Sequence, residues 1–276
     1  MEQEIELVGK IGSMALINKE DNDIDYNIFC RISKELRPGY VFVSSGATEI
    51  GRLDYIKRTG RELVGDPDEV KTDYAAQGQA ILMQNYRQFI HPSYSVRQVL
   101  VEHLHFNDPE KRKHLKEFLL RCPAQNAIPI INYNDAVSFE ENRKLEIALL
   151  SAKSKKVVEC VDNDETAAQI ACLLNAKYLL ILTSVDGIYF DFADPSTLVK
   201  EISGRSAEEV LRNIERCKAS CKGSSRKGSN GARAKLEYIK DAVIGGTTVK
   251  IANAKYRISD IMAGRAPCTT IGIKRE

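Results

Sequence analysis

The stretch Tyr178-Leu-Leu-Ile-Leu-Thr-Ser-Val-Asp-Gly187 decides the fold. Its first half is a near-continuous run of apolar residues, which is typical of a strand buried on both faces of a parallel sheet. Its second half is small and polar. In open α/β sheets, ligands bind beyond the carboxyl ends of the strands, so this half is a candidate binding loop. It holds Thr183, Ser184, Asp186 and Gly187.

Similar apolar runs and helical patterns alternate along the rest of the chain. The other predicted strands are Glu4–Lys10, Tyr40–Ser44, Val96–Val101, Ala127–Asn132, Thr248–Ala252 and Thr269–Ile273. The predicted helices are Tyr26–Leu36, Thr72–Phe89, Glu110–Arg121, Glu165–Asn175, Ala207–Arg216 and Ala234–Val243. This alternation predicts a three-layer αβα sandwich around a mostly parallel central sheet. We expect a single domain over residues 1–276, with lobes of about 1–165 and 166–276.

The charged segment Ser138–Cys160 interrupts this alternation. It ends in the apolar, β-branched run Lys156-Val-Val-Glu-Cys160, and we interpret it as an insertion that forms a hairpin.

Composition excludes several classes of protein. The 276 residues carry a net charge of only +2, whereas a dedicated nucleic-acid binder needs a basic face. The basic cluster Lys222–Lys227 is interpreted as a solvated loop, with nucleic-acid binding as the alternative. No segment approaches the roughly 20 apolar residues that cross a bilayer, and the acidic N-terminus does not resemble a signal peptide. The seven scattered Cys indicate reduced thiols, so a cytoplasmic location is expected.

Small, donor-rich or charged residues follow four of the predicted strands. They include Lys10, Gly12 and Ser13 after the first strand, Ser45 and Gly46 after the second, and Asn134 and Asp135 after the fourth. Taken singly, each group could be a turn, and Asp162-Asn163-Asp164 could simply cap the helix that follows. Together they supply the glycine loops and lysines that phosphoryl transfer requires.

The segment Gly228-Ser-Asn-Gly231-Ala-Arg-Ala-Lys235 opens a predicted helix. Backbone donors at a helix start, with a lysine in the first turns, favour an anion site. Its spacing is not that of a P-loop, and no dinucleotide-binding glycine motif follows a strand. The four His and seven Cys form no recognisable metal motif, so no residue is assigned as a metal ligand.

These motifs, in this order, resemble glutamate 5-kinase of the amino acid kinase family. The resemblance runs from about Lys10 to the end of the chain. The motifs that carry it are Lys10–Ser13, Val43–Ala47 with Gly51-Arg52, Ala75–Gln79, Ile128–Asp135, Asp162–Asp164, Leu180–Tyr189 and Gly228–Lys235. Ser-Gly-Ala, Pro-Ile-Ile-Asn-x-Asn-Asp and Asp-Asn-Asp together favour this branch over relatives that act on acetylglutamate, aspartate, carbamate or UMP.

The resemblance implies a role for each matching residue. Lys10 and Lys235 would flank the transferring phosphoryl group, and Asp164 would organise the two lysines. Glutamate would be bound by Ser45, Gly46, Asn134, Asp135, Asp162 and Asn163. The nucleotide would contact Lys10, Gly12, Ser13, Thr183, Ser184, Asp186, Gly187, Gly228, Ser229, Asn230, Gly231 and Lys235.

The implied reaction is the ATP-dependent phosphorylation of glutamate to γ-glutamyl phosphate, the first step of proline synthesis. ATP and Mg²⁺ are the implied cofactors, proline the implied feedback ligand, and a homo-oligomer the implied assembly. A glutamate carboxylate, with an unperturbed pKa of about 4.3, is already an anionic nucleophile at neutral pH. The chemistry therefore demands cations and aligned dipoles rather than a general base.

Several residues depart from the family pattern. Ser184 stands where an aspartate is usual, Gly9 replaces an apolar residue, and the segment between Asp135 and Asp162 is longer than expected. Many relatives carry a C-terminal PUA domain of the RNA-binding type, and for this sequence we expect the kinase domain alone. Two alternatives stay open: a kinase of the same fold for N-acetylglutamate, aspartate or carbamate, and a non-catalytic sensor of amino acids or nucleotides.

Overall fold

A computed structural model describes residues 5–138, 140–154, 157–160, 162–221 and 231–274. Its centre is an eight-stranded sheet in the order β10-β12-β11-β7-β1-β4-β6-β5. The strands are β1 (Leu7–Ile11), β4 (Tyr40–Ser44), β5 (Ser95–Val101), β6 (Ala127–Tyr133), β7 (Tyr178–Thr183), β10 (Glu201–Gly204), β11 (Thr248–Asn253) and β12 (Cys268–Ile273). Six neighbouring strands, from β11 to β5, run parallel, and β12 pairs antiparallel with β11.

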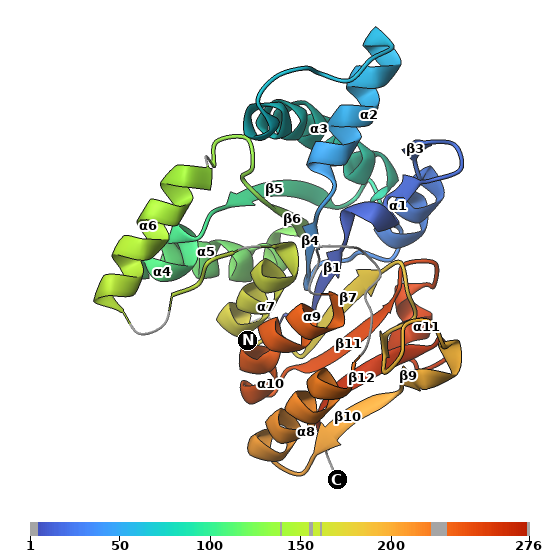
Figure 1. Ribbon diagram of the computed structural model, residues 1–276, viewed down its shortest axis with the longest axis vertical. Coiled ribbons are helices and arrows are strands. Elements are labelled where there is room, and N and C mark those ends of the chain that lie inside the picture. The colour runs from blue at the N-terminus through green and yellow to red at the C-terminus, as the bar shows by residue number, and fades with distance from the viewer. Residues whose placement is uncertain (1–4, 139, 155–156, 161, 222–230, 275–276) are drawn as a thin grey trace.

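Helices cover both faces of this sheet (Figure 1). They are α1 (Tyr26–Ser33), α2 (Ala47–Thr59), α3 (Pro67–Phe89), α4 (Leu104–Asn107), α5 (Pro109–Arg121), α6 (Glu140–Lys153), α7 (Asn163–Leu174), α8 (Ala207–Ser220), α9 (Gly231–Tyr238), α10 (Lys240–Ile244) and α11 (Ile258–Met262). Among the described residues, no helix is both long and apolar enough to span a membrane.

Successive residues of the central strands enter two different cores. On β7, Leu179 and Ile181 belong to the core beneath α5, α7, α8 and α10. Leu180 and Leu182 belong to the core beneath α1, α2, α3 and α11. Both sets are fully buried, which explains the continuous apolar run Leu179–Leu182. The predicted three-layer αβα sandwich with a mostly parallel sheet is confirmed.

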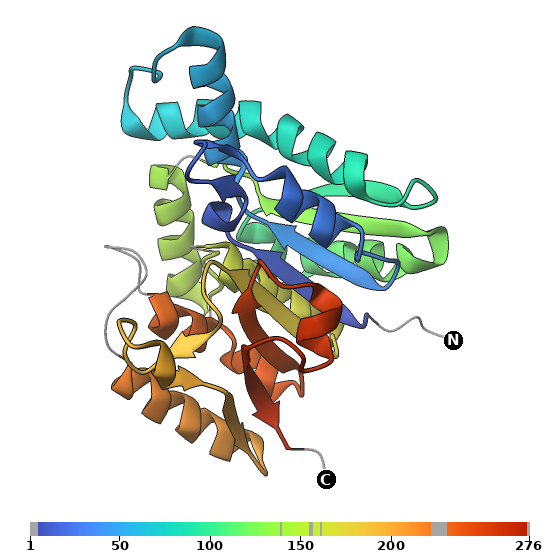
Figure 2. The same ribbon diagram turned by 90° about the vertical axis from the view of Figure 1, so that its right-hand side faces the viewer.

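Short elements complete the chain. The ribbons are β2 (Ile17–Asn18) with β3 (Asp23–Ile24), and β8 (Ile188–Tyr189) with β9 (Leu198–Val199). Single 3₁₀ turns span Ser13–Ala15, Pro123–Gln125 and Pro195–Thr197. The blue-to-green half of the chain and the orange-to-red half lie at opposite ends of the molecule in both views (Figures 1 and 2).

The prediction of a hairpin in Ser138–Cys160 is wrong. The described part of this segment contains the 14-residue helix α6, and residues 157–160 form no strand. Glu, Lys, Leu and Ala, which are good helix formers, dominate Glu140–Lys153, and this preference prevails over the β-branched pair Val157-Val158. Helix α2 and strand β10 were not predicted, and the helix predicted over Ala234–Val243 is two helices, α9 and α10.

Helices α2 and α3 cross at two glycines. A Cβ at Gly51 would lie 1.9 Å from the carbonyl oxygen of Tyr74, and a Cβ at Gly78 would lie 1.8 Å from that of Ala47. Neither position can therefore hold a side chain without moving a backbone. Because Ala47 is the first residue of α2, the contact at Gly78 fixes where this helix begins, directly after Ser45 and Gly46.

Candidate active site

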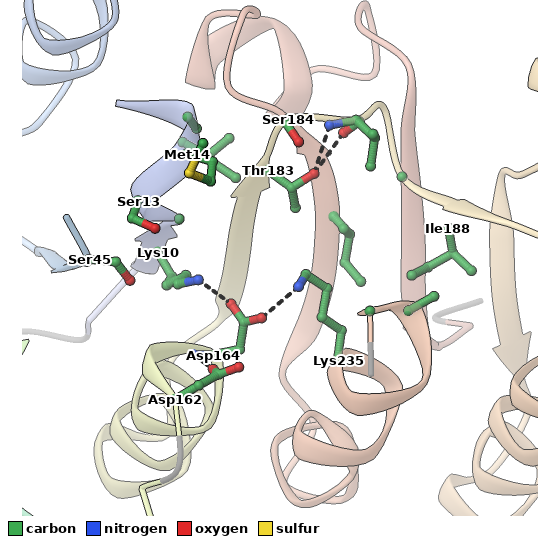
Figure 3. Close-up of a pocket in the computed structure, with 18 of the residues that line it drawn as sticks. Lys10, Ser13, Met14, Ser45, Asp162, Asp164, Thr183, Ser184, Ile188 and Lys235 are labelled. Atoms are coloured by element: carbon green, nitrogen blue, oxygen red, sulfur yellow. Dashed lines mark hydrogen bonds and ion pairs between the residues drawn. The ribbon is translucent and has the colours of Figure 1, made fainter. Parts of the chain in front are cut away.

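Two lysines converge on one buried carboxylate (Figure 3). Lys10 Nζ lies 2.6 Å from Asp164 Oδ1, and Lys235 Nζ lies 2.8 Å from Asp164 Oδ2. The Asp164 side chain is only 2% exposed. The structure thus brings together three residues that are 71 or more positions apart in the sequence (164 to 235 is 71).

The elements that carry these three residues meet at the carboxyl ends of the central strands. Lys10 is on β1, between β4 and β7. Asp164 is in the first turn of α7, where Asp162 is the N-cap and its side chain accepts a hydrogen bond from the Asp164 backbone N–H. Lys235 is on α9. Both the N-cap and the acidic first turn suit a helix N-terminus, so the local sequence folds as expected.

The contacts among Lys10, Asp164 and Lys235 determine the protonation states in this cluster. Burial alone would raise the pKa of Asp164, but Lys10 and Lys235 lower it to about 2. Burial would lower the pKa of Lys235, but the Asp164 carboxylate raises it. The pKa of Asp162 is raised by burial and by the neighbouring Asp164 carboxylate. At neutral pH, Asp164 is therefore ionised and Lys235 is protonated.

A cavity of about 420 Å³ opens on one side of this group. It is lined by Lys10, Gly12, Ser13, Thr183, Ser184, Gly187, Gly231 and Lys235, all predicted nucleotide contacts. Asp186, also predicted, is not part of this lining, and its carboxylate lies 3.2 Å from Lys255 Nζ. The predicted residues Gly228, Ser229 and Asn230 lie outside the described residues.

A second cavity, of about 460 Å³, adjoins the first. Its lining includes the predicted substrate residues Ser45, Gly46, Asp135, Asp162 and Asn163. Asn134 does not line either of these cavities. Its side-chain amide instead donates a hydrogen bond of 2.9 Å to Glu102 Oε1.

Asn163 has an acceptor that no described residue uses. Its Nδ2 donates to Ser45 Oγ at 3.1 Å and to Asn132 Oδ1 at 2.9 Å. Its Oδ1 is buried without a hydrogen-bond partner among the described residues. An unsatisfied buried acceptor is costly, so a donor group of a ligand is its natural partner. Asn163 lines both cavities, so this residue lies where they join.

Asp135 provides a negative charge in the second cavity. Burial raises its pKa, while the nearby cations Lys71 and Arg143 counteract that rise. Lys71 Nζ lies 3.8 Å from Asp135 Oδ1. The second cavity thus presents both charge signs to a ligand, as a zwitterion would require.

The two cavities share five lining residues, namely Ser13, Met14, Ser45, Asp162 and Asn163. A group bound in one cavity can therefore reach a group bound in the other across this boundary. With Lys10 beside it, the boundary suits a reaction between two anions, because fixed cations offset their repulsion.

Sequence reasoning missed several residues of this region. Asn132 orients Asn163, and its own amide donates to Gln79 Oε1 at 2.9 Å on α3. Its place at the end of a predicted strand was a usable signal. Lys71 and Arg143 also line the second cavity, but both come from segments whose position in space the sequence does not reveal.

A sequence model described as "Amino acid kinase family" matches residues 6–253. The chain belongs to the amino acid kinase family.

Curated members of the family resemble this one over most of its length. Glutamate 5-kinase of Geobacillus thermodenitrificans is 30% identical over 278 residues, which cover 97% of this chain and 67% of that protein. Glutamate 5-kinase of Clostridium perfringens is 30% identical over 249 residues, which cover 88% and 82%. Glutamate 5-kinase of Streptococcus suis is 30% identical, and the match covers 90% of this chain and 64% of that protein. The predicted resemblance to glutamate 5-kinase is confirmed, and the matched part is about two thirds of the Geobacillus protein.

Two solved structures share the fold of this chain. Carbamate kinase from Giardia lamblia bound to AMP-PNP aligns with a TM-score of 0.61 at 15% identity, covering 99% of this chain and 100% of that one. UMP kinase from Bacillus anthracis aligns with a TM-score of 0.52 at 14% identity, covering 97% and 96%. At these identities the likeness concerns the fold alone.

Proposed function

We propose that this amino acid kinase family member transfers the γ-phosphoryl group of ATP to the side-chain carboxylate of glutamate. The observation that carries this proposal is the pair Lys10 and Lys235 held on Asp164 where two cavities meet. The 30% identity to glutamate 5-kinases supports the choice of substrate.

In the reaction, a glutamate carboxylate oxygen forms a bond to the γ-phosphorus while the bond to the β–γ bridging oxygen breaks and ADP leaves. The nucleophile needs no deprotonation, because a carboxylate is ionised at neutral pH. The main obstacle is repulsion between two anions. Lys10 and Lys235 would offset this repulsion, and Asp164 would hold both ammonium groups in place.

The first cavity suits a nucleotide. Gly12 lies beside the Lys10 ammonium group, since a Cβ at this position would be 3.7 Å from Lys10 Nζ. Gly187 and Gly231 lie in the same lining. We assign this cavity to ATP, and with it the carboxyl-terminal lobe of about residues 166–276, while the lobe of about 1–165 holds the substrate.

Mg²⁺ fits this site as an ion carried by the nucleotide. Among the described residues, no three His, Cys, Asp or Glu side chains gather as a metal site of their own. Mg²⁺ commonly keeps water and phosphate ligands and needs one or two carboxylates. Asp162, which lines both cavities, is the residue that would contact the ion or its water. When bound, the ion neutralises charge on the phosphates.

The second cavity suits an amino acid. The Asp135 carboxylate and the unpaired Asn163 Oδ1 are acceptors for an α-ammonium group. Ser45 lies at the boundary, next to the carboxylate that reacts. An N-acetylated substrate would lose the positive charge that Asp135 recognises, which favours free glutamate over acetylglutamate.

The test is a substrate panel. Purified protein with ATP and Mg²⁺ is assayed for ADP formation with glutamate, aspartate, N-acetylglutamate and carbamate. Hydroxylamine is added to trap the acyl phosphate as a hydroxamate. We expect ADP and hydroxamate with glutamate. Turnover with any of the other three but not with glutamate would favour a same-fold kinase for another acid. Nucleotide binding without turnover of any acid would favour a sensor.

Feedback by proline and assembly into a homo-oligomer remain predictions of the family resemblance, and a cytoplasmic location remains a prediction from the sequence. Each has a direct measurement: inhibition by added proline, the mass in solution, and cell fractionation.

A further inference from the structure

Helix α6 contributes a cationic side chain to the second cavity, which we propose binds glutamate. The helix lies between Asp135 and Asp162, in the segment that is longer than the family pattern, and it is found at one side of the molecule (Figure 1). One of its residues, Arg143, lines the second cavity together with Asp135 and Asn163. This inserted helix is therefore part of the wall around the substrate.

Most N–H donors of the Arg143 guanidinium have no hydrogen-bond partner among the described residues. It donates one hydrogen bond to another described residue, from Nη1 to the carbonyl oxygen of Cys160, and this bond is long at 3.4 Å. A guanidinium carries five N–H donors in a fork that matches a carboxylate. The Cys160 contact thus orients the side chain and leaves most of the fork available to a ligand.

The orientation of a bound glutamate follows from the charges of the cavity. The reacting side-chain carboxylate belongs at the boundary of the two cavities, near Ser45 and Lys10. The α-carbon then lies deeper in the second cavity, where Asp135 attracts the ammonium group. A second carboxylate remains on that carbon and requires a cation.

Two cations line this end of the cavity, and they are not equivalent. Lys71 Nζ is 3.8 Å from Asp135, and its side chain is 58% exposed. Arg143 is partly buried. A partly buried guanidinium binds a carboxylate bidentately, whereas an exposed ammonium is well hydrated and loses more by binding.

We propose that Arg143 binds the α-carboxylate of the substrate and makes α6 a specificity element for acids that carry a second carboxylate. This inference rests on the proposed function, because it assigns an orientation to glutamate within that site.

The position of Arg143 is supported from the next turn of the helix. Glu146 Oε2 lies 2.9 Å from Nε2 of His103, which is 2% exposed. Burial lowers the pKa of His103, an effect that the Glu146 and Glu102 carboxylates partly oppose. The contact therefore joins α6 to the residue that precedes α4, and it holds the helix against the body of the protein before substrate binds.

The experiment compares two ligands that differ only in the group assigned to Arg143. 4-Aminobutyrate is glutamate without its α-carboxylate. Isothermal titration of the whole chain with each ligand gives the affinities of wild type, Arg143→Gln, Arg143→Lys and Lys153→Gln. Lys153→Gln is the matched control, because it removes the same charge from an exposed position in the last turn of α6.

We expect Arg143→Gln to weaken glutamate binding about 10- to 100-fold, which is typical for the loss of hydrogen bonds to a charged group. Its affinity for 4-aminobutyrate should not change, so the preference for glutamate disappears. Arg143→Lys keeps the charge but not the forked guanidinium, so its affinity for glutamate should lie between those of wild type and Arg143→Gln. Lys153→Gln should bind glutamate as wild type does. If Arg143→Gln does not fold, the inference is tested by the ratio of the affinities of Arg143→Lys for glutamate and for 4-aminobutyrate.

Two results would overturn the inference. One is an Arg143→Gln variant that retains the wild-type preference for glutamate, and the other is a wild type that binds both ligands equally. The hydroxamate assay keeps the proposed function separate. Glutamate binding that depends on Arg143 but leads to no turnover would support this inference and contradict the proposed function. Turnover of glutamate, with Arg143→Gln still preferring glutamate over 4-aminobutyrate, would support the proposed function and contradict this inference.

Discussion

At the scale of single residues, the carboxylate of Asp164 determines the state of the site. It is buried, yet it stays ionised because two ammonium groups contact its two oxygens. A single acidic residue thereby positions both cations that the transferred phosphoryl group would meet. Gly9 is also fixed by packing: a Cβ there would lie 2.6 Å from the Phe42 ring on β4, so the ring occupies the space that a side chain at position 9 would need.

Removing one cation should affect the reaction far more than the fold. We expect Lys235→Ala to lower kcat by a factor of about 100 or more, as the loss of one preorganised donor does in other enzymes. The measurement is ADP formation at saturating glutamate and ATP. The control is Lys200→Ala, which removes an exposed lysine that lines neither cavity. Equal kcat values in the two variants would contradict the assignment of Lys235.

The pKa of Asp164 also predicts how acid acts on stability. Its folded pKa is about 2, below the ordinary value of 3.8, so the unfolded chain takes up this proton first. Its contribution to stability is present above pH 3.8 and is lost as the pH falls toward 2. Thermal unfolding between pH 6 and pH 2.5 should show a steeper acidic decline for wild type than for Asp164→Asn. Parallel curves would contradict the ion-pair geometry.

At the scale of elements, the crossing of α2 and α3 sets one wall of the substrate cavity. Gly78 touches the first residue of α2, and the preceding Ser45 and Gly46 line the cavity. Gly46 has φ of 111°, a left-handed conformation that favours glycine and lets the chain turn sharply from β4 into α2.

Gly78→Ala should therefore destabilise the protein by about 1–3 kcal/mol, as overpacking usually does. It should also weaken glutamate binding, because α2 must move. Denaturant unfolding and titration with glutamate measure the two effects. Gly245→Ala is the comparison, since a Cβ there lies an ordinary 3.4 Å from the Ala242 oxygen and the backbone has φ of −70°. A Gly78→Ala variant as stable as Gly245→Ala would show that the helices can separate at no cost.

The sequence predicts some of these elements better than others. Strands such as Tyr178–Thr183 are predictable because burial on both faces requires apolar residues at successive positions, here Leu179–Leu182. Helix α2 is not predictable in this way, because its sequence has little periodicity. It also contains Gly51, a residue that allows the close contact with α3. Lys10 and Asp164 were predictable from their places beside strand and helix ends. Arg143 was not, because its position depends on how the inserted segment packs.

At the scale of the whole molecule, the second cavity is lined only by residues between 13 and 163, whereas the first also uses residues between 182 and 251, and the two meet at five shared residues. Each ligand should therefore stabilise the protein independently, since a ligand that binds only the folded state raises its stability.

A double test of this arrangement uses thermal shifts. AMP-PNP with Mg²⁺ and glutamate should each raise the Tm of wild type. Asp135→Asn should abolish the shift by glutamate and keep the shift by AMP-PNP, whereas Lys235→Ala should reduce the shift by AMP-PNP and keep that by glutamate. Loss of both shifts in either variant would mean that the two cavities do not act as separate sites.

The carboxylate that joins the two lysines also determines how the site reacts with reagents from outside. Amines are acylated as the free base, and the Lys235 pKa is raised above its ordinary 10.5 by Asp164. Nearly every molecule therefore presents an unreactive ammonium at this position. Amine-directed probes should label exposed lysines first and reach Lys235 only slowly, so an inhibitor for this site would need an anionic group that pairs with the ammonium rather than an electrophile that reacts with a free amine.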